Sequence, residues 1–141
     1  KVINQRRGNT INLLLAEKDL MLDLEFTAWD YDVLLPEDGI IAHANHYVSP
    51  KFTHYDNNKR EIESSIVRYA RAVELLQGIE GKAGVDDLKR ILADKGICTE
   101  FPGAGLYQNW GTFRRLIMIP AEKKLMISNP SDGGAYKTYT L

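Results

Sequence analysis

The chain has 141 residues, a formal net charge of -1 at pH 7 and a pI of about 6.3. The charge balance argues against a nucleic-acid partner, and no apolar run approaches the roughly 20 residues that span a bilayer. The single cysteine, Cys98, cannot form an internal disulfide, which favours a cytoplasmic, reducing compartment. The chain begins at Lys1 without Met and without a signal-peptide core, so we expect a processed product or a piece of a longer protein.

The first elements predicted in chain order form a β-hairpin. Apolar residues alternate through residues 10–16 and through residues 20–27, with the polar turn of residues 17–19 between them. Residues 29–38 contain three Asp and one Pro that interrupt any regular pattern, so no element is predicted there. The hairpin is the clearest local feature of the first 40 residues.

Two helices are predicted in the middle of the chain. Residues 56–58 offer N-cap side chains, apolar residues then recur at helical spacing to Gln77, and Gly78 ends the pattern. Arg68 falls on the charged face of this helix, which we expect to meet solvent. A second, shorter helix is predicted over residues 85–95.

The last third of the chain is predicted to be a loop followed by three strands. Residues 99–108 contain Gly and Pro, and alternating or apolar runs then cover residues 111–119, 123–128 and 135–141. Segregated helices and hairpin-connected strands indicate an α+β fold with an antiparallel sheet packed with two helices. We expect residues 1–141 to form a single domain.

An apolar run that ends in polar side chains marks the candidate site. Residues 39–42 are Gly-Ile-Ile-Ala and predict a short buried strand over residues 40–45, which ends in His43-Ala44-Asn45-His46. Polar groups at the end of a buried strand are costly to desolvate unless they line a site. A buried Asn45 would offer two N–H donors, which suits stabilisation of an oxyanion.

A metal site at His43 and His46 is an alternative interpretation of the same residues. Two residues three apart share a helix face, but on a strand they point to opposite faces. No zinc-type spacing links them to further ligands, so we expect no metal and no cofactor. His43 is explained as well by a core histidine bonded to a backbone carbonyl.

No convincing nucleophile is present in the chain. Cys98 follows a helix C-terminus, where the helix dipole disfavours a thiolate, so it reads as a small buried hydrophobic residue. A serine nucleophile would need a strained elbow such as G-x-S-x-G, which is absent. The sequence therefore contains an oxyanion-type asparagine without the group that would attack.

Six stretches occur in a recognisable order along the chain: residues 8–15, residues 22–27, Gly39 to His46, Ser64-Ser65-x-x-Arg68, Gly96-Ile97-Cys98 and residues 111–128. Together they resemble the acyl-CoA:6-aminopenicillanic acid acyltransferase family of N-terminal-nucleophile (Ntn) hydrolases. His-x-Asn-His after an apolar strand is the most specific part of the resemblance. The resemblance covers nearly the whole chain and maps to the C-terminal portion of the family's sequence.

The resemblance implies an αββα sandwich and a precursor that cuts itself before an internal cysteine. The freed cysteine then attacks amide or thioester carbonyls with its own α-amine as base. Asn45 matches the oxyanion-stabilising asparagine, whereas the nucleophile belongs to a segment upstream of Lys1. The family has an arginine shortly before the strand that begins near Gly111, and this chain has Asn109 there, with Trp110 beside it.

The leading hypothesis is the C-terminal part of a cysteine-dependent Ntn-type acyltransferase or amidohydrolase, inactive alone. We expect a small acyl substrate, an acyl-CoA or an amide, and a need for the upstream half or a homo-oligomer partner. A non-catalytic α+β module and a metal-dependent hydrolase using the two histidines remain as alternatives. The candidate pocket residues are His43, His46, Trp29, Asp30, Tyr31, Asn109 and Trp110.

Overall fold

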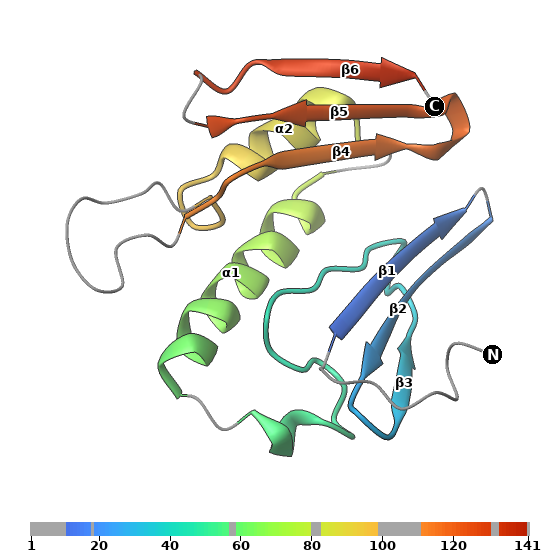
Figure 1. Ribbon diagram of the computed structural model, residues 1–141, viewed down its shortest axis with the longest axis vertical. Coiled ribbons are helices and arrows are strands. Elements are labelled where there is room, and N and C mark those ends of the chain that lie inside the picture. Colours follow the sequence, from blue (N-terminus) through green and yellow to red (C-terminus); the bar gives the residue numbers. More distant parts are fainter. Residues whose placement is uncertain are drawn as a thin grey trace. The chain divides into compact units, whose positions relative to one another are not determined.

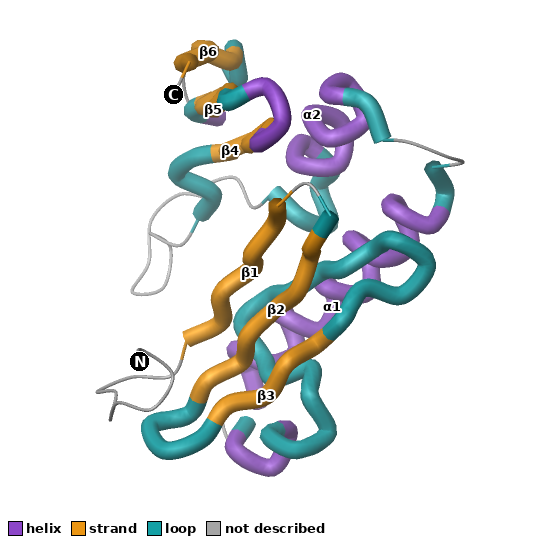
Figure 2. Tube along the Cα trace, turned by 90° about the vertical axis from the view of Figure 1, so that its right-hand side faces the viewer, coloured by secondary structure: helices purple, strands orange, loops and turns teal. Residues whose placement is uncertain are grey.

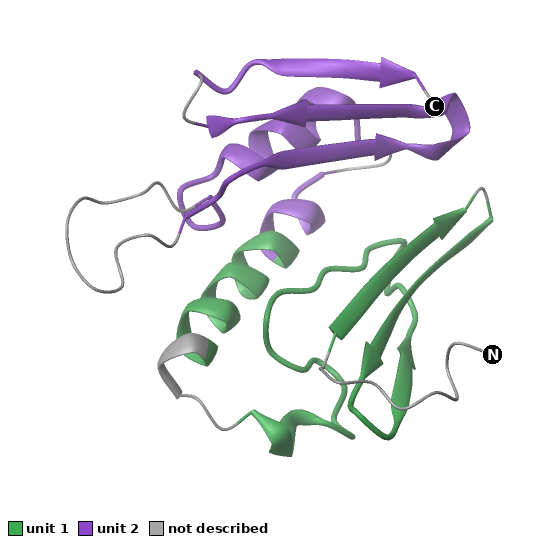
Figure 3. Ribbon diagram, viewed as in Figure 1, with its two compact units in different colours: residues 1–73 green, residues 74–141 purple. Residues whose placement is uncertain are grey.

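A computed structural model describes residues 11–17, 19–56, 59–79, 83–98, 111–130 and 133–140 of the chain. The chain divides into two compact units, residues 1–73 and residues 74–141, which Figure 3 shows in different colours. Each unit contains one three-stranded antiparallel sheet. Helices and antiparallel strands thus confirm the predicted mixed α+β class.

The sheet of unit 1 has the order β1-β2-β3 (Figure 1). The predicted hairpin is confirmed, and Leu14 pairs with Asp23 at its centre. The prediction of no element over residues 29–38 is wrong for β3, because Thr27 Oγ1 accepts the N–H groups of Trp29 and Asp30 and turns the chain back. The strand bounds are β1 Ile11–Glu17, β2 Leu20–Phe26 and β3 Tyr31–Leu34.

The strand predicted over residues 40–45 is absent, and a loop takes its place. Asp38 and Gly39 have φ values of 50° and 75°, so they form a tight turn in which Glu37 and Ile40 exchange backbone hydrogen bonds. Residues 41–44 then have no regular structure. The prediction fails because the N–H groups of the following residues bond to side chains of other elements instead of a neighbouring strand.

The first helix is confirmed as α1, Lys59–Gln77, and it ends at Gly78 as predicted. A short 3-10 helix, η1 at Thr53–Tyr55, precedes it. Part of its apolar side is open, since Ile66 and Val67 are exposed. Ser65, by contrast, is fully buried and faces the loop that carries His43 to Ser49.

Unit 2 packs a short helix against its own sheet of order β4-β5-β6, as the view in Figure 2 shows. Ile91 of the helix, Ile117 of the sheet and Cys98 are buried. The elements are α2 Val85–Ala93, β4 Arg115–Ile119, η2 Pro120–Glu122, β5 Lys124–Ser128 and β6 Tyr136–Thr140. These positions confirm the predicted second helix and three strands. Among the described residues, no helix combines the length and apolarity needed to cross a membrane.

Candidate functional site

Glu25 is a fully buried carboxylate around which the loop of residues 43–49 is folded. Its Oε1 lies 2.7 Å from His43 Nε2 and accepts the Val48 N–H at 2.6 Å. Its Oε2 accepts the Ser49 N–H at 2.9 Å. Three donors from one loop therefore meet a single side chain of β2, and this charge organises the loop.

The tautomer and charge of His43 follow from its two contacts. Nδ1 lies 2.5 Å from the carbonyl oxygen of Ala44, which can only accept, so Nδ1 carries a proton. Burial pushes the pKa of His43 down, but the hydrogen bond to Glu25 and the charge of Asp23 outweigh it and leave the pKa above 6.5. Burial likewise opposes ionisation of Glu25, but the His43, Val48 and Ser49 donors hold its pKa below 4.5.

Asp23 is buried beside this pair without a hydrogen-bond partner. It is 0% exposed, its Oδ2 lies 3.7 Å from His43 Nε2, and neither carboxylate oxygen is bonded to any described residue. The Asn12 side chain and the Leu13 N–H lower the pKa of Asp23 without reaching hydrogen-bond geometry. Burial raises the pKa of Asp23, more than the nearby His43 lowers it.

Helix α1 fixes the next part of the loop through Ser65 and Arg68. Ser65 Oγ accepts the Asn45 N–H at 2.6 Å and lies 2.8 Å from His46 Nδ1. Arg68 is half-buried, and its Nη2 donates to Asn45 Oδ1 at 2.8 Å in an exposed contact. Positions three apart share a helix face, which is why both side chains reach the same stretch of loop.

Asn45 is exposed, which corrects the expectation of a buried side chain at a strand end. Its carboxamide oxygen is held by Arg68, while no described residue accepts from its NH₂ group. Since the oxygen is engaged, the amide cannot flip without losing that bond. The two N–H donors therefore have a fixed direction and are free to meet a ligand.

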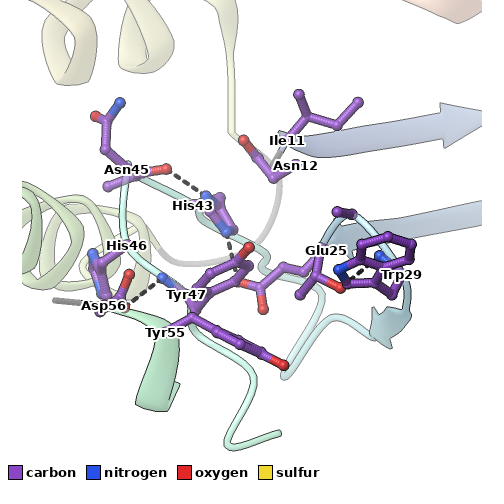
Figure 4. A pocket seen from close by; sticks show the side chains of 13 residues that line it. Ile11, Asn12, Glu25, Trp29, His43, Asn45, His46, Tyr47, Tyr55 and Asp56 are labelled. Atoms are coloured by element: carbon purple, nitrogen blue, oxygen red, sulfur yellow. Dashed lines mark hydrogen bonds and ion pairs between the residues drawn. The ribbon is translucent and has the colours of Figure 1, made fainter. Parts of the chain in front are cut away.

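Asn45 lines an open cavity of about 490 Å³ in unit 1, together with His43, His46 and Trp29 (Figure 4). Trp29 stands at its rim with 73% of its surface exposed. Asp30 and Tyr31 do not line the cavity, and Asp30 instead pairs with Lys51 at 2.8 Å. Two further predicted pocket residues, Asn109 and Trp110, lie outside the described residues.

The two histidines serve different neighbours. His43 contacts Glu25, whereas His46 contacts Ser65 and packs edge-on against Tyr69 at 5.4 Å between ring centroids. The two side chains contact different neighbours, as expected, but both histidines lie on a loop and not on a strand. In the part of the chain that the structure describes, the potential metal ligands that gather in a group of three are Asp23, Glu25 and His43, and His46 is not among them.

The chain matches no protein-family model and no curated protein. The site must therefore be interpreted from its own geometry. That geometry comprises an amide whose oxygen is held by Arg68, a buried ion pair of Glu25 and His43, and an open cavity that all three of Asn45, Glu25 and His43 line.

The sequence pattern did not identify Asp23, Glu25 or Ser65 as site residues. Asp23 and Glu25 occupy the polar positions of an alternating strand, a pattern typical of a solvated face. The available signal for Ser65 was its spacing from Arg68 within the stretch that resembles the acyltransferase family. Cys98 is buried in unit 2, where Arg115 Nη2 lies 3.1 Å from its Sγ.

Proposed function

We propose that this chain supplies the oxyanion-stabilising wall of a cysteine-dependent Ntn-type acyltransferase or amidohydrolase. The enzyme would act on the carbonyl of an amide or thioester in a small acyl substrate. Its nucleophilic cysteine would come from a segment upstream of Lys1, which the family resemblance implies. The observation that carries this proposal is Asn45, a residue that lines the cavity and whose side-chain oxygen accepts from Arg68, which leaves its N–H groups as the donors for a ligand.

The N–H donors of Asn45 would be needed when the carbonyl oxygen of the substrate becomes an oxyanion. When a cysteine thiolate attacks the carbonyl carbon, a C–S bond forms and the carbonyl π electrons move onto oxygen. Asn45 would donate an N–H to that oxyanion, where preorganised donors are most effective. Collapse of the intermediate re-forms the carbonyl and expels the amine or thiol, and water or an amine then takes the acyl group from cysteine.

Glu25 and His43 have a positioning role in this scheme. Glu25 binds the loop on either side of Asn45, through His43 before it and Val48 and Ser49 after it. Ser65 holds the Asn45 backbone N–H from the other side. A loop held at so many points gives its amide donors a constant direction, and a catalytic dipole depends on that constancy.

We also propose that unit 1 belongs to an αββα sandwich completed by further chain or by a second copy. β1 is exposed along its whole length, and Ile11, Leu13 and Leu15 are among its exposed apolar residues. An uncovered apolar edge strand tends to associate. Light scattering on this chain alone should show an oligomer or aggregate, and a stable dilute monomer would contradict this part of the proposal.

The decisive experiment uses the complete protein with amide and thioester substrates. Asn45→Ala should lower kcat by roughly 10²–10³-fold, the usual effect of removing an oxyanion donor. Asn129→Ala is the matched control, since Asn129 follows β5 in unit 2 and does not line the cavity. Equal turnover by the Asn45 variant and the unaltered protein would refute the role of Asn45.

A non-catalytic α+β module is the competing function. It predicts that the complete protein has no upstream cysteine that thiol-directed acylating probes can label. Single-site labelling at such a cysteine, blocked by substrate, would exclude this alternative.

A further inference from the structure

The group of Asp23, Glu25 and His43 has an unbalanced charge. Two buried carboxylates face one imidazolium, which leaves one net negative charge in the interior. Three donors satisfy Glu25, but Asp23 has no hydrogen-bond partner among the described residues and shares His43 with Glu25 at the longer distance of 3.7 Å. A buried carboxylate without hydrogen bonds is costly, so such a group is expected to meet a cation or to hold a proton.

We propose that Asp23, Glu25 and His43 form a binding site for one divalent transition-metal cation of the zinc class. The site goes beyond the proposed acyltransferase function, which needs no metal, and it does not involve His46. A divalent cation with two carboxylates and a neutral imidazole sums to zero charge. The cation thus removes the imbalance that the three side chains leave by themselves.

The geometry already has the form of a ligand set. One oxygen or nitrogen from each of the three side chains lies within 4.8 Å of the others. Tetrahedral zinc with bonds of about 2.0–2.2 Å places its ligands roughly 3.3–3.6 Å apart. The 3.7 Å between Nε2 and Asp23 Oδ2 is close to that spacing, whereas the 2.7 Å between Nε2 and Glu25 Oε1 is a hydrogen-bond distance that must lengthen when the ion binds.

His43 is oriented as metal-bound histidines usually are. Its Nδ1–H donates to the backbone carbonyl of Ala44, so Nε2 is the nitrogen directed at the two carboxylates. In metalloproteins such an outer hydrogen bond fixes the tautomer and the ring orientation. Glu25 and His43 also line the cavity, from which a water molecule can supply the fourth ligand.

The donor atoms indicate which cations fit. One imidazole nitrogen and two carboxylates suit Zn²⁺, Co²⁺ or Mn²⁺. Ca²⁺ requires six to eight oxygen ligands, and Mg²⁺ prefers a hydrated octahedral site. We therefore expect Zn²⁺ to bind well and Ca²⁺ and Mg²⁺ to compete poorly.

The test is zinc binding by the complete, chelator-treated protein, followed by elemental analysis after gel filtration. About one equivalent of Zn²⁺ should be retained, and His43→Gln should weaken binding by roughly 100-fold or more, since even outer-shell changes cost about 10–100-fold. His54→Gln is the matched control, because His54 lies in η1 and outside the ligand group. Equal zinc retention by the His43 variant, or no retention by the unaltered protein, would overturn the proposal.

Asp23→Asn provides a variant that should fold, because it removes a buried charge that has no hydrogen-bond partner while keeping the shape of the side chain. It should lose zinc binding as His43→Gln does. Cobalt gives a readout without any substitution, since four-coordinate Co²⁺ absorbs visible light. Visible bands that appear with one equivalent of Co²⁺ and disappear with Zn²⁺ support the site. Their absence means that Asp23 is balanced by a proton instead, which contradicts the proposal.

Discussion

The two sheets have the same size and the same antiparallel order, but they bury different chemistry. The strand β2 at the centre of the first sheet buries Asp23 and Glu25 at 0% exposure. In the second sheet, Ile117 of β4 and Ser128 of β5 are buried, and the helix α2 adds Ile91. The first unit therefore has charged groups in its interior, whereas the second is held mainly by apolar packing.

This difference separates a region organised for chemistry from a region organised for stability. A buried ion pair adds little net stability, because desolvation of both charges offsets their attraction. Its benefit here is orientation, since Glu25 binds a loop that has no sheet or helix bonding of its own over residues 41–48. Apolar groups such as Ile117 are non-directional and stabilise without fixing a loop in this way.

Substitution of Glu25 should give the largest effect and should show that the loop depends on its charge. Glu25→Gln removes the nearer of the two carboxylates that face the His43 imidazolium and weakens the hydrogen bonds from His43, Val48 and Ser49, so we expect a loss of about 3–5 kcal/mol in the free energy of unfolding. Urea denaturation of the protein measures this loss. Glu122→Gln, which breaks an exposed pair with Lys124 in unit 2, should cost less than about 1 kcal/mol.

A similar loss for Glu25→Gln and Glu122→Gln would mean that the buried pair does not hold the loop. Hydrogen exchange gives a local check, because the Val48 and Ser49 amides donate directly to Glu25. In the Glu25 variant these amides should exchange faster than those of the β4–β5 ladder.

Much of the fold could be predicted from local pattern. A period of two over residues 10–27 predicts β1 and β2, and helical spacing up to Gly78 predicts α1. β3 was missed because Asp30 and Asp32 resemble a turn, although in the structure the Asp32 position pairs with Glu25. The turn at Asp38-Gly39 had a recognisable signal, since Asp-Gly favours two successive residues with positive φ.

The candidate site was predictable only in part. His43 and Asn45 were identified as site residues because polar groups follow an apolar run. The surroundings of Glu25 could not be predicted, because its partners lie 18 to 24 positions further along the chain. Burial of an alternating strand's polar face depends on what packs over it, and no local pattern records that contact.

Substitution of Ile117 tests whether apolar packing stabilises unit 2. Ile117 is 3% exposed, and Ile117→Ala leaves a cavity in unit 2, so we expect a loss of about 2–5 kcal/mol. Met118→Ala is the matched control, since Met118 is the next residue on β4 and is exposed, and it should cost about 0.5 kcal/mol or less. Hydrogen exchange should show faster opening of the β4–β5 ladder while the Val48 and Ser49 amides stay protected. Equal losses for both variants would mean that unit 2 does not depend on this packing.

The smallest effect is expected from the titration of His46 in the metal-free protein. Burial lowers the pKa of His46 below 6.5, with only partial opposition from Asp56, whereas the pKa of His43 is raised above 6.5. In the unfolded chain His46 takes up its proton first as the pH falls, so its protonation destabilises the folded state between 6.5 and its lower native pKa. His46→Gln should remove that component and flatten the decrease in stability below pH 6.5. Proton NMR of the two imidazoles provides the direct check, with a midpoint below 6.5 for His46 and above 6.5 for His43. If His46 titrated at or above 6.5, the carboxylates of Asp56 and Glu25 would outweigh its burial, and its protonation would not destabilise the folded state.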